Sequence, residues 1–187
     1  MDYSKGTDAR IVANCVLDAR DFINLPTTQI ELQKLLYFCH ESFLVQYRKR
    51  LVSGYFEAWQ YGPVHPVVYD CFKKCKGEAI LERAAAYDLF SGEKHSLPKI
   101  EDTLPLRHIT ETVSRLSVYS AGQLIDLSHL EEGPWHSVVQ SAKNSVALGL
   151  RITDDVILEN RTHSMLMREG RPAEARGELP NDESPFT

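Results

Sequence analysis

Apolar residues recur every three or four positions through the first fifty residues, which is the period of an α-helix. The pattern predicts one helix over residues 9–23, with Asp8 as its N-cap. It predicts a second helix over residues 28–47, where Thr28 and Glu31 have the spacing of a capping box. The second helix has the clearest apolar face, so we expect it to form the core of the fold.

The helical period is lost after residue 50. Ser53-Gly54 is a turn signal between short runs rich in aromatic and β-branched residues, which predicts a β-hairpin with strands over 50–52 and 55–60. The segment Gly-Pro-Val-His-Pro at 62–66 is a rigid elbow, because its prolines fix their own backbone angles. Pro66 suits the first turn of a helix that continues over 67–76, where its missing N–H would be unpaired in any case.

The second half of the chain has a weaker pattern. The alanines at 84–86 suggest a helical turn, and the segments beside them have the composition of loops. Ser120 and Gln123 have capping-box spacing, and Thr153 precedes two acidic residues that suit the start of a helix. Further helices are therefore expected over residues 106–119, 120–127 and 135–143, and after Thr153.

Length and composition indicate one ordinary globular domain. The chain has 187 residues, of which 43% are hydrophobic and 25% charged. We expect a mainly α fold, a single helical domain with a small β-hairpin, over residues 1–168. From Glu169 onward prolines, glycine and polar residues dominate, which predicts a flexible polar tail over residues 169–187.

The formal net charge of −5 argues against nucleic acid or an anionic membrane as a partner of the whole chain. Two basic clusters nevertheless form a candidate contact patch, on one face beside the hairpin, where Tyr55 and Phe56 would stack on bases. The simpler interpretation is that these cations end helices, and a third is that they meet an acidic protein surface. The patch consists of Arg48, Lys49, Arg50, Lys73 and Lys74.

No pattern of catalytic or metal-ligating residues stands out. Cys71 and Cys75 are four residues apart, but zinc sites need closer pairs and a second ligand pair. Cys39 and His40 are neighbours on a helix and so point about 100° apart. We therefore expect reduced, mostly buried cysteines, no metal, no cofactor and no enzymatic activity. With no secretory signal and no long apolar run, we expect a cytoplasmic protein that does not enter membranes.

Three segments together resemble the SocA-like (Panacea) antitoxin family, which also includes phage-associated proteins. They are LQKLLYF at 32–38, AWQYGPVHPVVY at 58–69 and LSHLEEGPW at 127–135. The second segment is long and chemically unusual, and all three occur in the family's order. Ser128 departs mildly from the family pattern, in which threonine is common.

The resemblance implies an antitoxin that binds a cognate protein toxin and neutralises it. Some members are similar to proteolytic adaptors, which deliver the toxin to an AAA+ protease. A nucleic-acid-binding regulator remains the alternative from another class, although the negative net charge argues against it. Neither the resemblance nor the sequence decides whether the chain forms a homo-oligomer.

The motif residues have two interpretations, an architectural corner or direct toxin contact, and we favour the corner because strand-to-helix elbows usually serve packing. Composition alone places Gln33 and Lys34 in solvent, while the resemblance suggests that they bond the elbow or line a groove. His129 is expected to be a hydrogen-bonded structural histidine. The motif residues are Gln33, Lys34, Tyr37, Trp59, Tyr61, Gly62, Pro63, Val64, Pro66, Tyr69, His129, Pro134 and Trp135.

Overall fold

The computed structural model describes residues 5–88, 90–143 and 150–160, and its fold is mainly α, as predicted. The predicted tail over 169–187 lies outside the described residues. The helices are α1 (Ala9–Phe22), α2 (Gln29–Tyr47), α3 (Pro66–Phe72), α4 (Thr103–Leu116), α5 (Ala121–Ser128), α6 (Pro134–Lys143) and α7 (Asp154–Glu159), with a 3₁₀ turn at Lys73–Cys75. The strands are β1 (Phe56–Trp59), β2 (Gly62–Val64), β3 (Ala85–Tyr87), β4 (Lys94–Ser96) and β5 (Arg151–Ile152).

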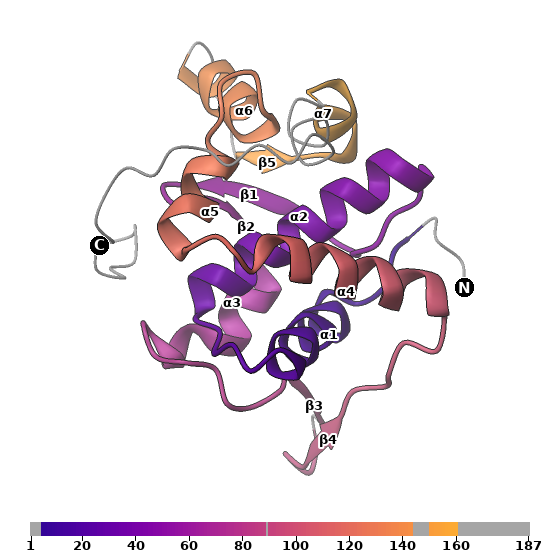
Figure 1. The fold of residues 1–187 in the computed structure, drawn as a ribbon. Coiled ribbons are helices and arrows are strands. Elements are labelled where there is room, and N and C mark those ends of the chain that lie inside the picture. Colours follow the sequence, from indigo (N-terminus) through magenta and orange to yellow (C-terminus); the bar gives the residue numbers. More distant parts are fainter. Residues whose placement is uncertain (1–4, 89, 144–149, 161–187) are drawn as a thin grey trace.

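Helix α2 lies at the centre of the fold, as expected (Figure 1). It packs against α1 and α4 on one side and against β2, α5 and α7 on the other. Its buried residues are spread around the whole helix and include the polar Gln33, Lys34, His40 and Glu41. A helix surrounded by protein needs no polar face, so polar residues on it must find partners inside the protein.

Side-chain caps define the predicted helix starts. Asp8 caps α1, Thr28 and Glu31 form the capping box of α2, and Ser120 and Gln123 form that of α5. Helix α4 begins three residues earlier than predicted, because Asp102 accepts a hydrogen bond from Leu104 N and caps it.

A β-hairpin is present, and the strand predicted over 55–60 takes part in it, but the strand predicted over 50–52 and the turn at Ser53-Gly54 are wrong. Strand β1 pairs antiparallel with β2 through a turn at Gln60-Tyr61, with Trp59 opposite Gly62. Val52 instead forms a parallel bridge with Thr7, so the turn at Gly54 connects no paired strands. Strand β5 completes an antiparallel sheet in the order β2-β1-β5, a pairing across almost a hundred residues that no local pattern indicates.

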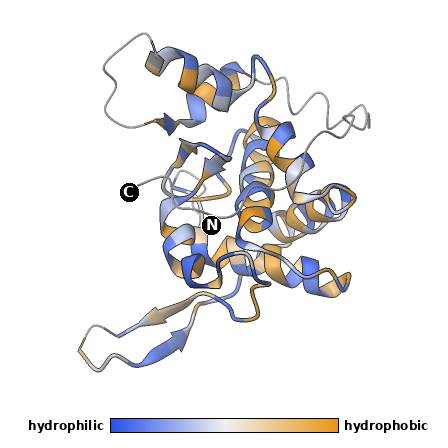
Figure 2. Ribbon diagram, turned by 90° about the vertical axis from the view of Figure 1, so that its left-hand side faces the viewer, coloured by the Kyte–Doolittle hydropathy of each residue, from blue (hydrophilic) through white to orange (hydrophobic). Residues whose placement is uncertain are grey.

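The predicted helical turn at 84–86 is also wrong, because Ala85–Tyr87 forms strand β3 and pairs with β4. A distant side chain overrides the helix preference of alanine. Asn14 on α1 donates from Nδ2 to Ala84 O at 2.9 Å and accepts from Ala84 N at 2.8 Å. The β3–β4 hairpin projects away from the helical body (Figure 2).

Among the described residues, no helix combines the length and the apolar character needed to cross a membrane.

Candidate functional site

The Lys34 side chain is buried in the protein, with about 1% of the residue exposed. Its Nζ donates a hydrogen bond of 2.9 Å to Pro63 O in β2. Burial lowers the pKa of Lys34 to about 7, because it removes water from the charged form. The expectation that Lys34 faces solvent is therefore wrong.

Gln33 is likewise buried, at 2% exposure, so its placement in solvent is wrong as well. Its Oε1 accepts a hydrogen bond of 2.8 Å from His65 N, the backbone group at the start of α3. Neighbouring residues on one helix thus hold two successive parts of the elbow, Pro63 through Lys34 and His65 through Gln33. Both side chains reach the elbow because α2 is enclosed on several sides.

Gly62 adopts a φ of +96°, a backbone conformation that side chains disfavour. A Cβ at this position would stand 2.3 Å from Ser128 Oγ and 2.7 Å from Lys34 Nζ. The β1–β2 turn, the centre of α2 and the end of α5 therefore meet at Gly62 with no room for a methyl group. Ser128 is itself buried and donates to Ile125 O at 2.7 Å.

Trp135 at the start of α6 connects the third motif segment to the second. Its indole Nε1 donates to Trp59 O at 2.8 Å, and its ring lies 3.9 Å from that of His129 between centroids. Trp59 in turn contacts the ring of Tyr69 on α3, at 4.8 Å between centroids. Burial, with the nearby Lys34 charge, lowers the pKa of His129 to about 4, so this imidazole is neutral at physiological pH.

We call the set Gln33, Lys34, Gly62, Ser128, His129 and Trp135 the motif junction. The remaining motif residues surround it. Tyr37 is buried with its ring edge-on to Phe56, Val64 is buried in β2, and Tyr61 is half-buried in the turn. Pro66 and Pro134 open α3 and α6, where a missing N–H costs nothing. The structure thus brings residues from all three motif segments into one interior contact.

The two basic clusters do not form one patch. Gln29, at the first turn of α2, donates to Tyr69 O on α3, so Lys73 and Lys74 lie near that end of α2. Arg48, Lys49 and Arg50 follow the last residue of the same 19-residue helix, about 28 Å away at 1.5 Å per residue.

The partners of these residues also differ from the expected patch. Arg50 pairs with Asp154 at 2.8 Å and Lys73 with Asp70 at 3.0 Å. Phe56, expected to stack on bases, is 2% exposed, whereas Tyr55 is 38% exposed and lies under Arg151.

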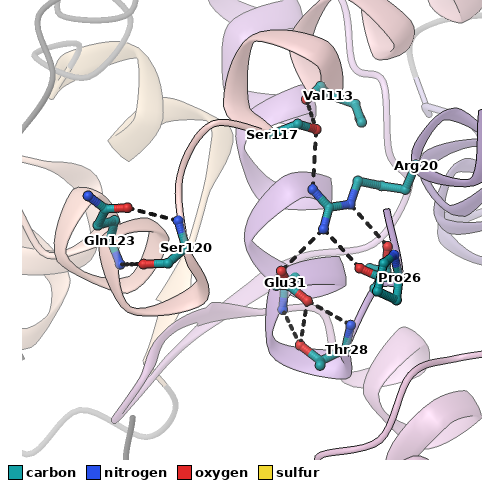
Figure 3. Close-up of polar contacts among 9 residues, drawn as sticks. Arg20, Pro26, Thr28, Glu31, Val113, Ser117, Ser120 and Gln123 are labelled. Carbon is teal, nitrogen blue, oxygen red and sulfur yellow. Dashed lines mark hydrogen bonds and ion pairs between the residues drawn. The ribbon is translucent and has the colours of Figure 1, made fainter. Parts of the chain in front are cut away.

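Arg20 is a polar centre that the sequence did not reveal (Figure 3). It is 5% exposed and donates to Thr27 Oγ1, Pro26 O, Ser117 Oγ and Glu31 Oε1. These bonds join the ends of α1 and α4 to the capping box of α2. A single arginine on an amphipathic helix gives no signal of such a role, because its partners lie up to 97 residues away.

The β3–β4 hairpin, which we call the arm (residues 85–96), stands out on the surface because of a hollow and exposed apolar side chains beside it. A hollow of about 770 Å³ lies between the arm and α3, and Val67, Phe72 and Leu81 are among its lining residues. Three of its lining side chains are apolar and exposed, Val67 at 51%, Leu81 at 87% and Tyr87 at 63%, and Phe90 in the arm, outside the hollow, is 102% exposed. We call this hollow the arm groove.

The cysteines are all free, and their burial is more varied than predicted. Cys39 is buried, Cys15 and Cys75 are half-buried, and Cys71 is exposed. In the part of the chain that the structure describes, no three histidine, cysteine or acidic residues come together as a metal site.

A family profile described as "Antitoxin SocA-like, Panacea domain" matches residues 32–136, which is more than half of the chain and includes the whole motif junction. The chain therefore belongs to the SocA-like Panacea antitoxin family. It is also similar to a curated protein named Antitoxin SocA from Caulobacter vibrioides (strain NA1000 / CB15N), with 40% identity over 153 residues, 82% of this chain and 81% of the relative. No solved structure matches the chain significantly.

Proposed function

We propose that the protein neutralises a cognate protein toxin by binding it directly, without catalysing a reaction on it. The observation that carries the proposal is the similarity to Antitoxin SocA, which extends over most of both chains. It is supported by the motif side chains Gln33, Lys34 and Trp135, whose hydrogen bonds go to backbone groups of neighbouring segments of the same chain. Such an arrangement suits a binding scaffold.

The toxin would then be bound by the outer surface and not by the motif. Lys34, Gly62 and Ser128 are buried, so a partner reaches them only if the fold opens. In this proposal the motif fixes the relative positions of α2, α3, α5 and α6, and the surfaces of these elements bind the toxin. Variants of the motif would reduce neutralisation by unfolding the scaffold, and surface variants would reduce it without unfolding.

Two other functions are considered beside this one, a proteolytic adaptor and a nucleic-acid-binding regulator. As a proteolytic adaptor, the protein would bind the toxin and an AAA+ protease, and the toxin would disappear from cells. As a nucleic-acid-binding regulator, it would need its basic residues on one face. That function has less support, because the two basic clusters lie at opposite ends of α2.

The test is co-expression with the product of the neighbouring reading frame, in bacteria with and without the candidate AAA+ protease. Direct neutralisation predicts that growth returns in both strains, that the toxin level is unchanged and that the two proteins co-purify. Growth that returns only with the protease, with loss of the toxin, would establish the adaptor function instead. A neighbouring product that is toxic and neither binds nor is rescued would contradict both.

A further inference from the structure

The arm projects from the body and is fixed mainly at its base, apart from an exposed ion pair between Lys94 in β4 and Glu82 at 2.7 Å. Asn14 bonds both backbone groups of Ala84, and Arg83 pairs with Asp18 and Asp21 on α1. Beyond this anchor all three residues of β4 are exposed, and so is Tyr87 at the end of β3. A two-stranded hairpin is marginally stable in water when nothing packs on it. The arm is therefore expected to become stable when another protein surface packs on it.

The edges of the arm are open as well. Within the described residues β3 and β4 pair only with each other, so each strand keeps one edge of unpaired backbone groups. Open edges of this kind are templates for pairing with another strand. Phe90 is fully exposed at the far end of the arm, and Tyr87, also exposed, ends β3 and lines the arm groove of its own chain.

The arm groove offers one basic side chain, Lys74, that is complementary to the acidic far end of the arm. Arg10, Arg83 and Lys94 line the groove but pair with carboxylates of the same chain. Lys74 also lines it and makes no ion pair among the described residues, so it is the groove cation that can meet another chain. Residues 88–93, which connect β3 to β4, include Asp88 and Glu93 and no basic residue. Asp88 accepts hydrogen bonds from Phe90 N and Ser91 N, which lower the pKa of its carboxyl group and keep it ionised.

We propose that this surface binds a second copy of the chain, with the far end of each arm in the arm groove of the other. The chain itself supplies both complementary halves, as a twofold interface requires: an apolar tip with two acidic residues, and an apolar groove that presents Lys74. Two arms related by a twofold axis perpendicular to them lie antiparallel, which allows their open edges to pair. Each tip then reaches the base of the partner's arm, where the groove lies.

The test uses the purified chain alone, so its result is independent of the proposed toxin. Sedimentation velocity from low micromolar to roughly millimolar concentration should show a dimer. Tyr87→Ser with Phe90→Ser should weaken dimerisation by about tenfold or more, because buried aromatic anchors dominate interfaces. Val118→Ser, at an exposed apolar residue that lines no part of the arm groove, is the matched control and should leave dimerisation unchanged.

A charge exchange identifies the contact as intermolecular. Lys74→Glu and Glu93→Lys should each weaken the dimer, because each places like charges across the interface. An equimolar mixture of the two variants should restore it, because a mixed dimer pairs each glutamate with a lysine of the other chain. A chain that stays monomeric over the whole range, or a dimer that none of these substitutions affects, overturns the proposal. The proposal is also overturned if the chain is monomeric and the arm variants lose toxin binding, because the toxin then binds the arm and its groove.

Discussion

The motif junction and the arm use their polar and aromatic residues in opposite ways. In the junction, a lysine, a glutamine and an indole direct their hydrogen bonds at backbone groups of the same chain. In the arm, aromatic side chains point outward, and fixed contacts occur mainly at the base. The family's most recognisable residues thus build the scaffold, and the less recognisable segment has the features of a contact surface.

This difference has a consequence for interpreting variants. Loss of the hydrogen-bond partner of a buried lysine lowers the stability of the protein, because an unpaired polar group remains inside it. Replacement of an exposed aromatic residue hardly changes the stability of the isolated chain. It weakens binding when a partner covers that residue. Stability and binding measurements should therefore separate the two regions.

The largest effect is expected for Gly62→Ala. The positive φ and the 2.3 Å approach to Ser128 Oγ should together lower the free energy of unfolding by about 3 kcal/mol or more. Gly92→Ala is the matched control in the arm, where φ is +72° but no atom lies within 4 Å of the added methyl group, so about 1 kcal/mol is expected. Denaturant unfolding measures both, and equal losses would mean that the junction is not tightly packed.

Trp135→Phe should have the next largest effect. It keeps an aromatic ring beside His129 but removes the hydrogen bond to Trp59 O, which should cost about 2 kcal/mol. Thermal and denaturant unfolding at neutral pH measure the loss. A change below about 0.5 kcal/mol would indicate that the Trp59 carbonyl readily finds another partner.

Lys34→Met should change the pH dependence of stability. The native pKa of Lys34 is about 7 and the unfolded value is near 10.5, so the unfolded chain binds more protons between these pH values. The free energy of unfolding of the original chain should then rise with pH in this window, by up to about 1.4 kcal/mol per pH unit. The methionine variant lacks this contribution. Parallel pH profiles for the two proteins would show that burial does not disfavour the charged form of Lys34.

The smallest effect on stability is expected for Phe90→Ser in the arm. Because Phe90 is fully exposed, its loss should change the free energy of unfolding by less than about 0.5 kcal/mol. The measurement should be made at low protein concentration, where association does not contribute. A loss of more than 1 kcal/mol would place the arm within the folding core, contrary to the difference between the two regions.

Local signals in the sequence were sufficient for much of the fold. The capping residues Asp8, Thr28 and Ser120 and the elbow prolines act through neighbours in the chain, so their helices could be predicted. The pairing of β1 with β5, the strand at Ala85 and the bond from Arg20 to Ser117 depend on residues far away in the sequence. No periodicity encodes such contacts.

The sequence was sufficient to recognise the motif as a pattern but not to predict the physical role of its residues. Composition places Gln33 and Lys34 at the surface because such residues are usually solvated. Both are buried because α2 is enclosed by β2, α5 and α7, an arrangement known only once the fold is known. The arm had no signal of its own, since the alanines at 84–86, where it begins, suggested a helix.

The most direct test of the account is to titrate purified toxin with folded Trp135→Phe, at a temperature where circular dichroism shows the variant to be native. If the motif builds the scaffold and other surfaces bind the toxin, each folded variant molecule should neutralise as much toxin as the original chain, without any protease present. A folded variant that no longer binds the toxin would contradict the account, because Trp135 would then contact the toxin itself.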